Sequence, residues 1–139
     1  MMYTNLPFYG PFFIRIGLAA VFLLFGAQKM YAASQGSAEI QLILSTSFYE
    51  VPFQLASLLN FGIGIVELAL AAMLFLGWYT RLAAAAGTAL IVVIFMSIIA
   101  KYGLNFDPTI SRDLGLIGAS AGLWFLGGGK WSIDNKRTA

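Results

Sequence analysis

Residues 53–76 read FQLASLLNFGIGIVELALAAMLFL, an apolar run that contains one ionisable residue, Glu67. A helix needs roughly 17–25 mostly apolar residues to cross the ~30 Å hydrocarbon core of a bilayer, so this stretch can span a membrane. Three further apolar runs, at residues 12–30, 82–100 and 110–126, approach or reach the same length. The sequence therefore predicts an all-α integral membrane protein. We expect one four-span transmembrane domain over residues 1–139, folded as an antiparallel up-down-up-down four-helix bundle.

The composition agrees with this prediction and excludes several classes of function. Hydrophobic residues make up 60% of the chain, charged residues make up 10%, and there is no cysteine and no histidine. Disulfides, thiol catalysis, iron–sulfur clusters and His-ligated haem are therefore excluded within this chain. We expect no metal site and no covalently bound cofactor, so a redox role would require an organic cofactor such as a quinone, or a partner. The basic residues are explained by membrane topology, and no nucleic-acid partner is expected.

The connections between the spans indicate how the helices are arranged. The loop at residues 77–81 is so short that the second and third spans must be antiparallel neighbours. The connection at residues 32–52 is longer, and apolar residues between Ile40 and Phe48 recur there at helical spacing. That pattern predicts a short helix at the membrane interface, between the first and second spans.

The distribution of Lys and Arg predicts the orientation. With four crossings, both termini and the 77–81 loop lie on the same side of the membrane. The basic residues assigned to that side are Arg15, Arg81, Lys130, Lys136 and Arg137, and those assigned to the other side are Lys29, Lys101 and Arg112. Because cytoplasmic loops carry the excess of Lys and Arg, both termini are expected to be cytoplasmic.

Ionisable residues inside the spans are the candidate functional residues, because a charge at the bilayer centre costs ~2.5–3.5 kcal/mol on insertion scales. Glu67 is the clearest case, about 21 Å along its helix and too deep to reach water easily. It belongs to a polar, small-residue stripe on the second span, and the first span has a matching stripe. The two stripes are Asn60, Gly64, Glu67 and Ala71, and Arg15, Ala19, Phe22, Gly26 and Lys29.

From these stripes we expect two interior ion pairs, Arg15–Glu67 and Lys29–Asp113. Three interpretations of Glu67 stay open. The pairs could serve only to fix helix register and rotation. Glu67 could instead be functional, as a proton-transfer group or, together with Arg15 and Asn60, as a polar contact for a quinone or lipid headgroup. It could also face a partner subunit.

Several motifs, taken in order, resemble those of the DoxX family. They are RIG at 15–17, FLLFGAQK at 22–29, VEL at 66–68, LGWYTRLA at 76–83, RDL at 112–114 and GGGKWSID at 127–134. The resemblance implies a four-helix bundle in a prokaryotic cytoplasmic membrane, with Arg15, Lys29, Glu67 and Asp113 at family-like positions. Some members of that family are described as subunits of a thiosulfate:quinone oxidoreductase, and others as partners in redox or detoxification complexes.

These observations favour an accessory or quinone-linked redox subunit of a larger membrane complex. The chain offers no metal or flavin site of its own, so a partner would have to supply the electrons. Catalysis by the isolated chain is left open, with Glu67 as the candidate residue. The alternative is a small stand-alone transporter or lipid-handling protein, which is disfavoured because no inverted repeat or interrupted helix is evident.

Overall fold

The structure, a computed structural model, describes residues 9–35, 53–103, 108–129 and 131–137. These residues form four long helices and one short helix, and they contain no strand. The helices are α1 (Gly10–Gln35), α3 (Phe53–Leu76), α4 (Thr80–Tyr102), α5 (Pro108–Leu126) and α6 (Ile133–Arg137). The prediction of an all-helical protein is confirmed for this part of the chain. The expected interfacial helix between Ile40 and Phe48 lies outside the described residues.

Three of the long helices are long and apolar enough to cross a membrane. These candidate spans are Gly10–Tyr31 in α1, Ser57–Leu76 in α3 and Thr80–Ala100 in α4. Helix α5 is 19 residues long, but Arg112 and Asp113 lie near its start and lower its mean hydropathy. A fourth crossing by α5 therefore remains a prediction.

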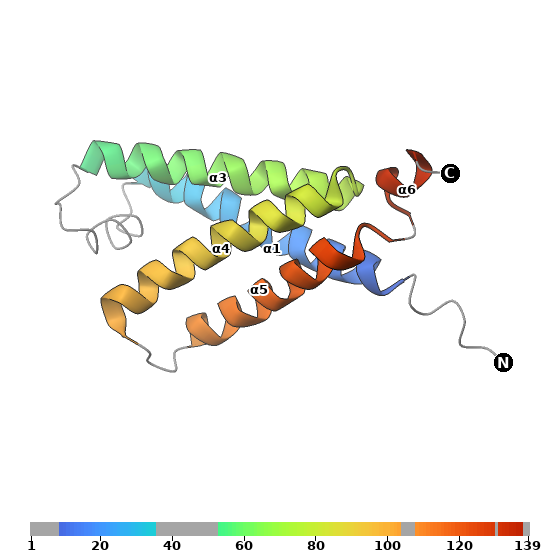
Figure 1. Ribbon diagram of the computed structural model, residues 1–139. Helices are drawn as coiled ribbons and strands as arrows, with labels where there is room; N and C mark the ends of the chain where they lie inside the picture. The colour runs from blue at the N-terminus through green and yellow to red at the C-terminus, as the bar shows by residue number, and fades with distance from the viewer. Residues whose placement is uncertain (1–8, 36–52, 104–107, 130, 138–139) are drawn as a thin grey trace.

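Consecutive long helices run in alternating directions (Figure 1). Helix α1 packs along α3, α4 packs along α5, and α3 diverges from α4 with distance from their short turn (Figure 1). Smaller contacts join α3 to α4 and α1 to α5. The start of α1, the α3–α4 turn and α6 lie at the same end of the molecule (Figure 1). We call this the turn end.

The turn between α3 and α4 is tight because Gly77 ends α3 in a left-handed conformation. Gly77 has φ 66°, and the Trp78 N–H donates to the Met73 carbonyl at 2.9 Å while the Gly77 N–H donates to the Leu74 carbonyl at 3.2 Å. This pair of hydrogen bonds is the Schellman arrangement that closes many helices. Tyr79 also has a left-handed φ of 48°, so the chain reverses and α4 begins at Thr80.

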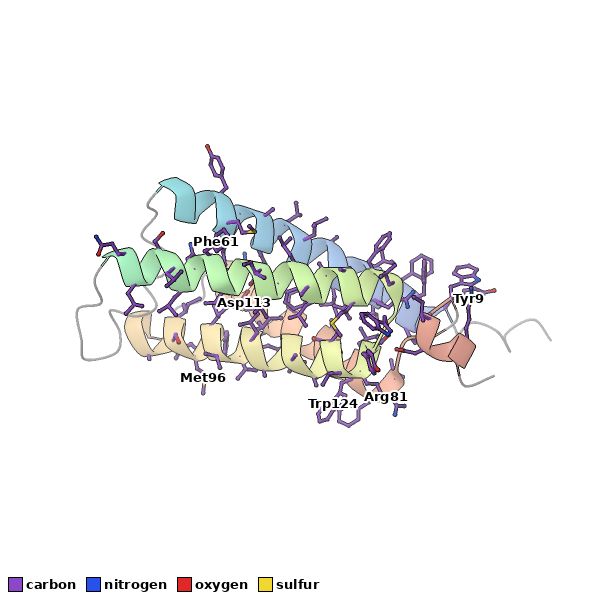
Figure 2. All side chains as sticks on the ribbon, turned by 90° about the horizontal axis from the view of Figure 1, so that it is seen from above. Tyr9, Phe61, Arg81, Met96, Asp113 and Trp124 are labelled. Carbon is purple, nitrogen blue, oxygen red and sulfur yellow. The ribbon has the colours of Figure 1, made fainter. Side chains whose placement is uncertain are left out.

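The core lies between the helices and is built from small and large apolar side chains in contact. Its buried residues are Leu18, Ala19, Phe22, Leu70, Ala71, Leu74, Ala83, Ala84, Ile91 and Leu123. Phe22 of α1 extends to α4, where a Cβ on Gly87 would lie 2.8 Å from its ring. Met96 and Trp124 instead point outward (Figure 2). An apolar outer surface of this kind suits a lipid environment.

Candidate functional site

The backbones of α1 and α3 approach each other closely at two glycines, and this contact fixes their register. A Cβ on Gly26 would lie 2.9 Å from the Gly64 carbonyl oxygen, and a Cβ on Gly64 would lie 3.0 Å from the Gly26 carbonyl oxygen. Small residues at a helix crossing allow this approach in membrane proteins. The predicted stripes face each other here, because Asn60 and Glu67 lie one turn on either side of Gly64.

Lys29 of α1 and Glu67 of α3 form an ion pair next to this crossing. The Lys29 Nζ donates to Glu67 Oε1 at 2.9 Å and to Oε2 at 3.0 Å. Both side chains are largely removed from solvent, with 13% of the Lys29 side chain and 3% of the Glu67 side chain exposed. A buried charge is tolerated only when it is paired and hydrogen-bonded, so each of these residues stabilises the other inside the helix pair.

The two predicted ion pairs, Arg15–Glu67 and Lys29–Asp113, are wrong. Glu67 pairs with Lys29, and Asp113 pairs with its neighbour Arg112. With Gly26 opposite Gly64 in antiparallel helices, Arg15 is level with position 75 of α3, about 12 Å along the axis from Glu67. Helical side chains also lean toward the N-terminus of their own helix. Lys29 and Glu67 therefore lean toward each other, whereas Arg15 leans away from Glu67.

Arg112 and Asp113 bring a second pair of charges close to the first. Arg112 Nε and Nη2 each lie 2.9 Å from Asp113 Oδ1. The Phe25 ring links the two pairs, since its centroid is 4.7 Å from Arg112 Cζ and 5.4 Å from Lys29 Nζ. Cations near an aromatic face gain about 0.5–2 kcal/mol, more when they are desolvated. Asp113 is buried and lies among the helices (Figure 2).

Asn60 completes this group, which we call the charge cluster: Phe25, Lys29, Asn60, Glu67, Arg112 and Asp113. Asn60 is 1% exposed, and its Nδ2 donates to the Lys29 carbonyl at 3.4 Å. Its Oδ1 is buried and has no hydrogen-bond partner. An unsatisfied buried acceptor costs about 1–3 kcal/mol, so this amide is an available hydrogen-bonding group beside an ion pair.

Arg15, the third candidate contact for a quinone or lipid, lies elsewhere, at the turn end. Its Nη2 donates to the Trp131 carbonyl at 3.1 Å, and its guanidinium carbon is 5.6 Å from the Phe12 ring centroid. Trp131 in turn makes edge contacts with Tyr9 and Phe12. Asn60 and Glu67 thus both contact Lys29, through its carbonyl and its ammonium group respectively, whereas Arg15 is separate from both.

Sequence reasoning missed two features of the charge cluster. It did not place Phe25 between the cations, although Phe25 precedes Lys29 by four residues and therefore shares its helix face. It also identified Arg112 without pairing it to Asp113, because adjacent residues on a helix normally point in different directions. The long Arg112 side chain overcomes this separation by turning back to its neighbour.

The charge cluster can donate and accept hydrogen bonds in an apolar setting, but it is poorly suited to hold a metal. Among the residues that the structure describes, no group of three or more Asp and Glu side chains could bind a metal ion. The cluster offers an ammonium donor, a carboxylate acceptor and an amide that can do both. Such a set fits a small polar group with carbonyl or hydroxyl oxygens.

Comparison with known proteins identifies the family but no individual relative. A family model described as DoxX matches residues 10–100 of the chain. The match includes α1, α3 and most of α4, and with them Lys29, Asn60 and Glu67. The motifs at 112–114 and 127–134 lie outside it. Comparison with curated proteins and with solved structures gave no match.

Proposed function

The chain belongs to the DoxX family of membrane proteins, and we propose that it binds the headgroup of a quinone as an accessory subunit of a membrane redox complex. The observation that carries this proposal is the buried Asn60 Oδ1 without a partner, on an amide that also donates to the backbone carbonyl of Lys29. A quinone carbonyl accepts a hydrogen bond, which Lys29 can donate. A quinol hydroxyl donates one, which Asn60 Oδ1 or Glu67 can accept.

The apolar setting supports the same proposal. A quinone carries an isoprenoid tail that stays in the hydrocarbon core, so its headgroup must be met from within the bilayer. The neighbours of the cluster on the outer surface of α3 are apolar and exposed, among them Phe61 and Ile65. A ligand can therefore lie against this face with its tail in lipid, and it would reach Asn60, which is 1% exposed, by displacing the side chains that cover it. Electrons would come from a partner, because the sequence has no cysteine or histidine and the described residues contain no cluster of acidic side chains that could hold a metal.

Binding of a short-chain ubiquinone analogue to the purified chain in lipid nanodiscs tests the proposal. The wild type should bind the analogue saturably, and Asn60→Leu should weaken binding about tenfold, the effect of one lost hydrogen bond in a buried site. Gln54→Leu is the matched control, because it removes an amide from an exposed position of the same helix and should leave binding unchanged. Absence of saturable binding by the wild type would refute quinone recognition.

The accessory role is tested separately by extracting the chain from native membranes in a mild detergent and identifying the proteins that co-migrate. A redox enzyme in that fraction supports the proposal. A chain that migrates alone contradicts the accessory role and favours a self-contained activity.

The four long helices are uninterrupted over their described lengths, which gives a transporter with broken helices no support.

The proposed topology has four crossings, with both termini on the cytoplasmic side of a prokaryotic inner membrane. It is supported by the alternating helix directions (Figure 1), and by the length of α5, about 28 Å at 1.5 Å per residue. Because the chain lacks cysteine, single cysteines at Asn135 and Gly103 can be labelled cleanly from either side. Labelling of both from the same side would contradict a membrane crossing by α5.

A further inference from the structure

A second polar cluster at the turn end is separate from the proposed quinone site. Asp134 folds back onto the start of α4, where its Oδ1 accepts from the Tyr79 N–H at 2.8 Å and its Oδ2 from the Thr80 N–H at 2.7 Å. The Asp134 N–H donates to the Gly77 carbonyl at 3.0 Å. The first amides of a helix have no partner within the helix, and their positive potential attracts anions. The Asp134 carboxylate therefore occupies a position where helices bind anions.

A buried arginine faces the same place. Arg15 is 1% exposed, and its Nη1 lies against Gly77, the residue whose carbonyl accepts from the Asp134 N–H. Its Nε and Nη1 have no hydrogen-bond partner. Thr80, fully buried at the first position of α4, also has an unpartnered hydroxyl. The site therefore offers unpartnered N–H groups of Arg15 and the Thr80 hydroxyl in addition to the two amides that Asp134 binds. An anion with more acceptor oxygens than a carboxylate could bind more of these donors.

We propose that the N-terminus of α4, together with Arg15 and Thr80, is a binding site for a phosphate group, which Asp134 occupies as an internal substitute in this structure. A phosphodiester has two charged oxygens and two weaker ester acceptors, against the two oxygens of a carboxylate, and its charged oxygens suit an arginine fork. The expected source is the headgroup of an anionic phospholipid. Exposed Trp78, Tyr79 and Trp131 surround the site, and such aromatic residues lie at headgroup depth.

The segment that carries Asp134 is suited to be displaced. Helix α6 has five residues, and its start is held by the Ser132 hydroxyl, which accepts from the Asn135 N–H at 3.1 Å. Trp131, just before it, has a left-handed φ of 66°, which is unfavourable for a residue with a Cβ. Undocking α6 would free the Tyr79 and Thr80 amides and uncover Arg15, whose recorded hydrogen bond is to Trp131.

Hydrogen exchange at the Tyr79 and Thr80 amides, measured by NMR on the full chain in nanodiscs, tests this proposal. In phosphatidylcholine discs, Asp134→Ala should accelerate exchange about tenfold, as expected for loss of a helix cap. Addition of phosphatidylglycerol should restore most of the protection, and the double variant Arg15→Gln/Asp134→Ala should stay fast. Asn135→Ala, which leaves the Asp134 carboxylate in place, is the matched control and should exchange like the wild type.

Inorganic phosphate added to phosphatidylcholine discs separates the two sources of the anion. Protection by phosphatidylglycerol alone assigns the site to a lipid headgroup, and protection by inorganic phosphate assigns it to soluble phosphate. If neither protects Asp134→Ala while amides in the middle of α4 stay slow, the proposal is overturned.

Should Asp134→Ala fail to fold, Asp134→Asn keeps one acceptor oxygen and is tested in the same way. In the wild type, phosphatidylglycerol should accelerate exchange at the Asp134 amide, and an unchanged rate would count against displacement.

Discussion

Helix α1 carries two cations whose surroundings differ, the largely covered Lys29 at the charge cluster and the buried Arg15 at the turn end. Lys29 has a carboxylate at 2.9 and 3.0 Å on the neighbouring helix. Arg15 Nη2 donates to the Trp131 carbonyl of the C-terminal segment, and its Nε and Nη1 have no hydrogen-bond partner among the residues that the structure describes. The Lys29 site is thus complete within the α1–α3 pair. The Arg15 site depends on residues more than a hundred positions away in sequence.

This difference separates two charges that neutralise each other from a cation whose hydrogen-bonding groups are incompletely satisfied. A buried ion pair with both charges satisfied is costly to break. A guanidinium with unsatisfied N–H groups under a short helix gains from any additional acceptor. We therefore expect loss of Lys29 to lower the stability of the protein much more than loss of Arg15 does, in addition to any effect on quinone binding.

The largest expected effect is the loss of stability in Lys29→Met, which we compare with the loss in Arg15→Met. Lys29→Met leaves Glu67 buried without its ammonium partner and should lower the free energy of unfolding by about 3–5 kcal/mol. Arg15→Met removes an incompletely partnered charge and should cost about 1 kcal/mol. SDS-induced unfolding in mixed micelles, followed by circular dichroism, measures both. The double variant Lys29→Met/Glu67→Leu should recover much of the loss, and equal losses for the two single variants would abolish the distinction between the sites.

The sequence was sufficient to predict the four long helices and the faces that α1 and α3 bury, because apolar length and a helical period are local properties, but it did not predict α6. The stripes through Gly26 and Gly64 are buried as predicted. The pairing of charges was not predictable, because it depends on where along their length two helices cross and on which way each side chain leans. Asp134 and Trp131 were missed as partners of the α3–α4 turn and Arg15, since these contacts join residues more than fifty positions apart and no sequence pattern marks them.

A smaller effect is expected at Gly77, which tests the position of Arg15. Gly77→Ala would place a methyl group on Arg15 Nη1 and would put a Cβ at φ 66°, so the free energy of unfolding should fall by about 2–3 kcal/mol. Gly62→Ala is the matched control on the same helix, where a Cβ would meet nothing within 4 Å. There, alanine should be neutral or stabilise by up to about 1 kcal/mol. A similar tolerance at both positions would mean that Arg15 does not lie against the turn.

The smallest expected effect concerns a buried hydrogen bond between uncharged groups. Its cost in stability is the reference for judging the loss expected at Lys29. The Ser120 hydroxyl of α5 donates to the Ala84 carbonyl of α4 at 2.9 Å, and Thr88 donates to the same carbonyl at 2.8 Å. Ser120→Ala therefore leaves no acceptor unsatisfied and should cost about 0.6 kcal/mol, as for other interhelical hydrogen bonds in membranes. Ser97→Ala, which removes a hydroxyl bonded within α4, should cost less in the same unfolding measurement. If Ser120→Ala cost as much as Lys29→Met, burial alone would set the energetics of polar groups in this protein. The contrast between Lys29 and Arg15 would then say nothing about charge.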